Sequence, residues 1–85
     1  MESPEIAARV RQILLDGVLR GSNPALLQDS TPLLSGGVLD SVRMVTLISD
    51  LERAFGVSFE AFEMSVDYLD SIAIIARTIR DKKTG

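Results

Sequence analysis

The chain has 85 residues and a formal net charge of −3 at pH 7, with 46% hydrophobic and 25% charged residues. This composition is typical of a folded protein, and the length predicts one domain, residues 1–85, around a single small core. Nine basic residues against twelve acidic ones argue against nucleic acid as a partner, and the lack of cysteine and histidine excludes disulfides and the usual zinc ligand sets.

The first residues and the hydropathy pattern bear on the compartment. Residues 1–5 lack the basic flank and apolar run of a signal peptide, and no stretch of the sequence approaches the roughly 18 apolar residues that a spanning helix needs. We therefore expect a cytoplasmic protein that does not insert into a membrane.

Hydrophobic periodicity predicts a first helix over residues 4–20. Its apolar residues follow the i, i+3, i+4, i+7 spacing that places them on one helical face. They are Ile6, Val10, Ile13, Leu14 and Val18. Pro4 suits the first helical position, and Gly21 is a typical stop signal after the last.

Residues 21–40 contain two prolines and three glycines among many polar residues, which predicts a long loop. Loops beyond roughly 12–15 residues are uncommon in compact domains unless they are functional or disordered. Six large apolar residues are expected to fasten this loop across the core, with one helical turn near Ala25. They are Leu26, Leu27, Leu33, Leu34, Val38 and Leu39.

A second helix is predicted from Asp40 or Ser41, either of which can cap it, to Phe55, where Gly56 supplies a stop signal. The expected buried stripe is Val42, Val45, Ile48, Leu51 and Phe55. Met44 and Leu47 fall at its border, and Arg43 lies on the opposite face.

The remaining residues predict a short helix and a longer one. A turn or two within residues 60–65 is expected to bury Phe59 or Phe62, and the last helix is expected to start with Asp67 as N-cap and Asp70 three positions later. The expected face of this helix is Leu69, Ile72, Ile75, Ala76 and Ile79, followed by a frayed tail from Arg80. The predicted fold class is all-α, a four-helix bundle of three longer helices and one short helix, with a long ordered loop between the first two.

Catalysis by the chain itself has little support in the residues. Ser41 lies where a loop meets a helix, but a Ser-His-Asp arrangement is impossible without histidine. Gly36 and Gly37 lack the remainder of a phosphate-binding loop motif, and glycines that let the backbone turn before the helix are the simpler interpretation. We predict no catalytic residue and no metal site.

Ser41 has two interpretations. A serine at a helix start is commonly an N-cap. Asp40 can cap the helix by itself, however, which would leave the Ser41 hydroxyl at the first helical position and free to face solvent. A phosphodiester on that oxygen would lie at the positive end of the helix dipole, where an anion is favoured by about 0.3–1 kcal/mol.

The run Leu34-x-x-Gly37-Val38-Leu39-Asp40-Ser41-Val42 resembles the attachment motif of the acyl and peptidyl carrier proteins, usually written Asp-Ser-Leu. The resemblance covers nearly the whole chain, including the order of helices and the long loop. Val42 replaces the usual leucine, and Arg43 stands where fatty-acid carriers tend to be acidic. The form Gly37-Val38-Leu39-Asp40-Ser41 is closer to free-standing carriers of aminoacyl or specialised acyl groups, as used in polyketide, nonribosomal peptide and related natural product biosynthesis, than to the Gly-Gly-His-Ser form common within peptide synthetases.

This resemblance implies a function. In the family, 4′-phosphopantetheine is esterified to the motif serine, so Ser41 is the expected attachment site of this covalent cofactor, with Asp40 assisting the modification. The implied partners are a phosphopantetheinyl transferase that uses coenzyme A, an acyl- or aminoacyl-adenylate ligase, and downstream synthase, condensation or tailoring enzymes. The chain would be a monomeric phosphoprotein that holds its cargo as a thioester and is not itself an enzyme.

Partner enzymes are expected to dock around Ser41 through a small contact, below about 1,200 Å². The expected contact residues are Val38, Leu39, Val42, Arg43, Met44 and Leu47. Met44 and Leu47 suit ordinary core positions equally well. The alternative function is a helical protein-protein interaction domain that never receives a prosthetic group, whereas a DNA-binding domain would need a basic face that the second helix lacks.

Overall fold

The computed structural model describes residues 4–84 of the chain, and residues 1–3 and 85 lie outside that range. The described residues form four α-helices and two short 3₁₀ helices, without a strand among them. In chain order these are α1 (Pro4–Asp16), η1 (Pro24–Leu26), α2 (Ser41–Phe55), η2 (Ala61–Glu63), α3 (Val66–Leu69) and α4 (Ile72–Thr84). The predicted all-helical class is therefore confirmed for residues 4–84.

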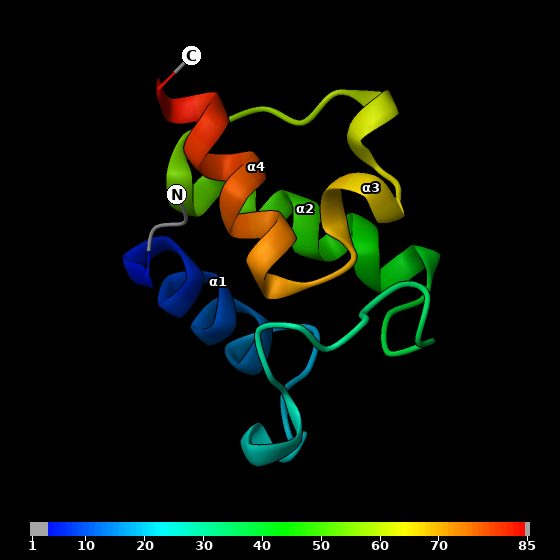
Figure 1. Cartoon of the computed structure of the whole chain (residues 1–85). Coiled ribbons are helices and arrows are strands. Elements are labelled where there is room, and N and C mark those ends of the chain that lie inside the picture. The colour runs from blue at the N-terminus through cyan, green and yellow to red at the C-terminus, as the bar shows by residue number, and fades with distance from the viewer. Residues whose placement is uncertain (1–3, 85) are drawn as a thin grey trace.

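Helix α4 packs against both α1 and α3, and α1 also packs against α2. Figure 1 shows the segment between α1 and α2 running across one end of these helices. The interior is apolar because each long helix turns one apolar face inward. Its buried members are Val10, Leu14, Leu19, Leu27, Leu33, Leu39, Leu47, Ile48, Leu51, Phe59, Leu69, Ile72, Ile75 and Ile79.

Helix α1 ends at Asp16, so the predicted end at residue 20 is wrong. The backbone N–H of Leu19 donates to the carbonyl oxygen of Leu14 at 2.8 Å, and the Arg20 guanidinium donates to the carbonyl oxygen of Asp16. These bonds satisfy carbonyls of the last turn that have no helical partner. The resulting turn carries Leu19 into the core, although the helical period had not placed it there.

The segment between α1 and α2 is held by apolar residues, as predicted, with one exception. Within residues 21–40, the buried or half-buried apolar residues are Leu27, Leu33, Leu34, Val38 and Leu39. The predicted turn near Ala25 is η1, where Asn23 Oδ1 accepts the backbone N–H of Ala25 at 3.0 Å. Leu26 on this turn has 75% of its surface exposed. The prediction that Leu26 fastens the loop to the core is therefore wrong.

Helix α2 has the predicted bounds but a different buried face. It begins at Ser41 and ends at Phe55, before Gly56 in a left-handed conformation. Val42 is 75% exposed and Val45 is 58% exposed, so the prediction that both valines line the core is wrong. The residues that α2 turns inward are Met44, Leu47, Ile48, Leu51 and Phe55.

The chain after α2 also differs in part from the prediction. The turn expected within residues 60–65 is η2, and Phe59 beside it is buried, whereas Phe62 is exposed and meets the Tyr68 ring edge to face. Asp67 lies inside α3 and Asp70 follows that helix, so the predicted capping of the last helix by these two residues is wrong.

Ser71 takes the capping role instead, since its Oγ accepts the backbone N–H of Ile74 at 3.1 Å where α4 starts. The predicted apolar face of this helix, Leu69, Ile72, Ile75, Ala76 and Ile79, is confirmed as buried. Helix α4 continues to Thr84, so the predicted fraying from Arg80 onward is not observed. Lys83 Nζ donates to the carbonyl oxygen of Phe55, which ties the end of α4 to the end of α2.

Candidate functional site around Ser41

Ser41 is the first residue of α2, and Asp40 is its N-cap. Asp40 has an extended backbone, and its Oδ1 accepts the backbone N–H of Arg43 at 2.8 Å. The carbonyl oxygen of Asp40 accepts the first helical hydrogen bond, from the backbone N–H of Met44 at 2.9 Å. Because one residue provides both bonds, the cap does not use the Ser41 side chain. The predicted capping by Asp40 is confirmed.

The Ser41 side chain is exposed at this helix end. Among residues 4–84, no group hydrogen-bonds its hydroxyl, and the backbone N–H groups of Ser41 and Val42 have no acceptor there either. A fifteen-residue helix begins at this point, so its dipole places partial positive charge beside the hydroxyl. An anion bonded to Ser41 Oγ would meet favourable charge and free donors.

The loop that leads to Ser41 is held in place by two buried leucines, Leu33 and Leu39. The backbone N–H of Leu39 donates to the carbonyl oxygen of Leu33 at 2.9 Å, and both leucine side chains are buried. Between them, a Cβ on Gly36 would lie 2.4 Å from the carbonyl oxygen of Pro32, a distance that only glycine tolerates. The two buried leucines thus hold a tight turn directly before Asp40 and Ser41.

The six residues expected to contact partners divide into three groups. Val42 and Arg43 are exposed beside Ser41. Val38 and Met44 are half-buried and form a rim, whereas Leu39 is 4% exposed and Leu47 is fully buried. The expectation that Leu39 and Leu47 lie in the contact surface is therefore corrected, because both side chains support that surface from inside the core.

Val45 joins this surface although the sequence interpretation had placed it in the core. Successive residues of an α-helix are rotated by about 100°, so a stripe built on repeated three-residue steps drifts around the helix. Val42 and Leu51, nine residues apart, lie on opposite sides for this reason. Met44, Leu47, Ile48 and Leu51 follow the i, i+3, i+4, i+7 spacing of a single helical face, which the sequence offers alongside the stripe that contains Val42 and Val45.

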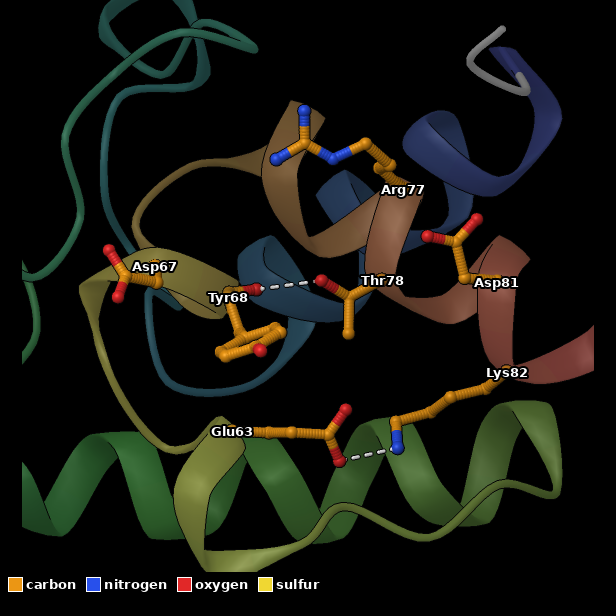
Figure 2. A pocket seen from close by; sticks show the side chains of 7 residues that line it. All are labelled: Glu63, Asp67, Tyr68, Arg77, Thr78, Asp81 and Lys82. Atoms are coloured by element: carbon orange, nitrogen blue, oxygen red, sulfur yellow. Dashed lines mark hydrogen bonds and ion pairs between the residues drawn. The ribbon is translucent and has the colours of Figure 1, made fainter. Parts of the chain in front are cut away.

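A second set of polar residues surrounds a cavity of about 260 Å³ beside η2, α3 and α4 (Figure 2). Glu63 and Lys82 point toward each other there, with Nζ and Oε1 separated by 2.5 Å, and Thr78 Oγ1 donates to the carbonyl oxygen of Tyr68 at 3.1 Å. The lining residues are Glu63, Asp67, Tyr68, Arg77, Thr78, Asp81 and Lys82.

Glu63 is poorly suited to acid catalysis at neutral pH. Burial alone would raise the pKa of Glu63, but the backbone N–H of Glu60 and the Lys82 ammonium outweigh burial and hold the pKa below its ordinary value of 4.5. Lys82 also lies over the Phe59 ring, 4.9 Å from its centroid. A carboxylate held ionised by a neighbouring cation does not donate a proton readily. We interpret this ion pair as a structural contact between η2 and α4.

Within residues 4–84, acidic side chains do not gather in a group of three that could hold a metal ion. None of the helices described for these residues combines the length and the apolar character needed to cross a membrane.

In comparisons with models of known protein families and with curated proteins, nothing matches this chain. The resemblance to carrier proteins therefore stays a prediction from the sequence.

Proposed function

We propose that the protein is a carrier that holds acyl or aminoacyl intermediates on a 4′-phosphopantetheine arm attached to Ser41. One observation carries this proposal: the Ser41 hydroxyl is exposed and unbonded among the described residues, at the first residue of a helix that Asp40 already caps. A side chain needed for capping would lose its helix contact on modification, and Ser41 has no such contact to lose.

The residues around Ser41 fit the group that the proposal requires. The hydroxyl oxygen is open to an incoming transferase, and the free backbone N–H groups of Ser41 and Val42 favour the phosphodiester that would result. Asp40 lies next to the hydroxyl and is exposed, which suits its assisting role. The attached arm would supply the thiol that this cysteine-free chain lacks, and with it thioester chemistry.

Partner enzymes would dock on the exposed surface next to Ser41, formed by Val42, Arg43 and Val45 with Val38 and Met44 at the rim. Two exposed valines one helical turn apart supply apolar contact area, and Arg43 adds a single positive charge. Such a surface is small, which suits partners that must bind and release in succession. The proposed partners are a phosphopantetheinyl transferase, an acyl- or aminoacyl-adenylate ligase, and downstream synthase, condensation or tailoring enzymes.

The four-helix bundle is part of the same proposal. The contacts of α4 with α1 and α3, and of α1 with α2, are compatible with the four-helix bundle of carrier proteins. A monomer in the cytoplasm, serving a specialised biosynthetic pathway, is the state in which we propose that the protein acts.

The experiment is intact mass spectrometry after incubation of the purified protein with coenzyme A and a broad-specificity phosphopantetheinyl transferase. The wild type should gain about 340 Da, the mass of one phosphopantetheine group. Ser41→Ala should gain nothing. Ser49→Ala is the matched control, because Ser49 is an exposed serine on the same helix, and this variant should be modified like the wild type.

Either of two results would refute the carrier function at this site: a wild-type protein that gains no mass, or a Ser41→Ala variant that is still modified. The first result would favour the alternative, a helical interaction domain without a prosthetic group. The exposed Val42 and Val45 suit that function too, because they offer a docking surface whether or not an arm is attached.

A further inference from the structure

Asp70, which follows α3, ties the loop before Ser41 to the rest of the fold. Its Oδ1 accepts the backbone N–H groups of Leu34 and Ser35, each at 2.8 Å, and its Oδ2 accepts the Ser35 hydroxyl at 2.7 Å. Its carbonyl oxygen accepts the backbone N–H of Leu33 at 2.6 Å. Three consecutive loop residues thus bond to one residue far along the chain. We call this group, Leu33, Leu34, Ser35 and Asp70, the Asp70 clasp.

The clasp continues toward Ser41 through the loop backbone. The carbonyl oxygen of Leu34 accepts the N–H of Gly37 at 3.2 Å, and the carbonyl oxygen of Leu33 accepts the N–H of Leu39 at 2.9 Å. Leu39 is followed directly by Asp40, the N-cap of α2. Each end of the turn between residues 33 and 39 is therefore anchored, and the anchored end next to Ser41 depends on the position of Leu33.

The clasp depends on the Asp70 carboxylate as its hydrogen-bond acceptor. The N–H groups of Leu34 and Ser35 have no other acceptor among residues 4–84, so they would be left unpaired or exposed to water without Asp70. Hydrogen bonds to an ionised acceptor are shorter and stronger than neutral ones. These same bonds, those of Ser35 above all, hold the pKa of Asp70 below its ordinary value, so the carboxylate is ionised at neutral pH.

We propose that Asp70 is a positioning residue for Ser41, which it serves by holding residues 33–39 in the conformation that presents Ser41 to the phosphopantetheinyl transferase. This inference rests on the proposed function, because it concerns the reaction at Ser41. Without the clasp, the transferase must order the loop when it binds. That ordering weakens binding of the carrier and leaves the chemical step in the bound complex nearly unchanged.

The first measurement is amide hydrogen exchange on the unmodified protein. In Asp70→Ala, the amides of Leu34, Ser35 and Leu39 should exchange at least about tenfold faster than in the wild type. The loop can then open to water without first breaking the hydrogen bonds to Asp70. Asp70→Asn is the rescue variant, since its amide oxygen accepts the same two backbone N–H groups without the charge, and its exchange should lie much closer to that of the wild type than to that of Asp70→Ala.

The second measurement is the kinetics of the transferase with coenzyme A and each variant as the carrier substrate. Asp70→Ala should raise KM for the carrier by about five- to tenfold with kcat within about twofold, and Asp70→Asn should restore KM. Lys82→Met is the matched control, because it breaks the ion pair between Lys82 and Glu63. This pair lies near the end of α4 that contacts Phe55, and Phe55 is at the opposite end of α2 from Ser41. Lys82→Met should leave KM unchanged.

Each outcome decides a separate point. If the wild type accepts no arm, the proposed function and this positioning role both fail. If the wild type is modified but Asp70→Ala keeps the same KM or the same Leu39 exchange, only the positioning role is overturned. Should Asp70→Ala fail to fold, Ser35→Ala removes one bond of the clasp and should raise KM about twofold, and an unchanged KM in that variant overturns the role equally.

Discussion

Asp40 and Arg43 are joined by a hydrogen bond in which Asp40 Oδ1 accepts the backbone N–H of Arg43 at 2.8 Å. This bond makes Asp40 the N-cap of α2, so the neighbouring Ser41 hydroxyl is not needed to cap the helix. A residue that contributes little to the fold can be modified without loss of the fold. Because Asp40 caps the helix, Ser41 is free for modification, and this is the physical basis of the proposed attachment site.

The first prediction separates these two residues by stability. Asp40→Ala should lower the free energy of unfolding by about 1 kcal/mol, because the N–H of Arg43 loses its acceptor. Ser41→Ala should change it by less than about 0.5 kcal/mol. Urea unfolding at fixed pH measures both, with Asp40→Asn as the control that retains a capping oxygen. Equal losses in the two alanine variants would mean that Ser41 also contributes to the cap.

The second prediction concerns the two faces of α2. Leu47→Ala should destabilise the protein by about 2–5 kcal/mol, because it leaves a cavity where a fully buried side chain was. Val42→Ala should cost less than about 0.5 kcal/mol, since Val42 is 75% exposed. Thermal or urea unfolding tests the contrast. A large loss from Val42→Ala would show that this valine packs in the core after all.

The third prediction concerns the end of α2. Gly56 has φ of 67°, and its N–H donates to the carbonyl oxygen of Glu52 at 2.9 Å. Gly56→Ala should cost about 1 kcal/mol from backbone strain alone, because a Cβ there meets no atom within 4 Å. Gly56→Asn should cost less, since asparagine tolerates the left-handed region better. Unfolding curves in which alanine is no worse than asparagine would contradict this explanation.

The fourth prediction concerns the ion pair between Glu63 and Lys82. The side chains are 9% and 17% exposed, so the pair is shielded from solvent far more than a typical surface pair. Lys82→Met and Glu63→Gln should each lower the free energy of unfolding by about 1–2 kcal/mol. The double variant should lose less than the two single losses added together, because the second change removes a partner that is already unpaired. Strict additivity would show that the two side chains do not interact.

The fifth prediction concerns pH. The hydrogen bonds from Ser35 and Leu34 place the pKa of Asp70 below its ordinary value of 3.8 in the folded protein. The unfolded chain therefore binds this proton more readily, so the stabilisation from Asp70 is fully present above pH 3.8 and is lost as the pH falls through the lower, folded pKa.

Urea unfolding at a series of pH values from about 6 down to about 2.5 measures this dependence. Asp70→Asn cannot ionise and should lose less stability than the wild type over the acidic part of the series. The pKa of Glu63 is also lowered in the folded protein, so Glu63→Gln serves as the comparison that retains the Asp70 contribution. Identical slopes for the wild type and Asp70→Asn would show that Asp70 does not carry the effect.

Local signals along the chain were enough to predict the elements near the candidate site. A capping residue, a helical period and a glycine after the last turn act over a few residues, and together they gave α2 its correct bounds from Ser41 to Phe55. The capping of α2 by Asp40 was predicted from the same local signals. Contacts with a partner far along the chain were missed, such as the ion pair between Glu63 and Lys82 and the bond from Lys83 to the carbonyl oxygen of Phe55.

The motif around Ser41, the lack of histidine and cysteine, and the bounds of α2 all follow from the residues and their order along the chain. The rotation of α2 that exposes Val42 and Val45, and the attachment of the loop to Asp70, were decided by packing. The reason is that several faces of α2 carry apolar side chains, so only the shape of the surrounding core selects among them. A hydrogen bond across 35 residues likewise forms only when the folded chain brings its two ends together.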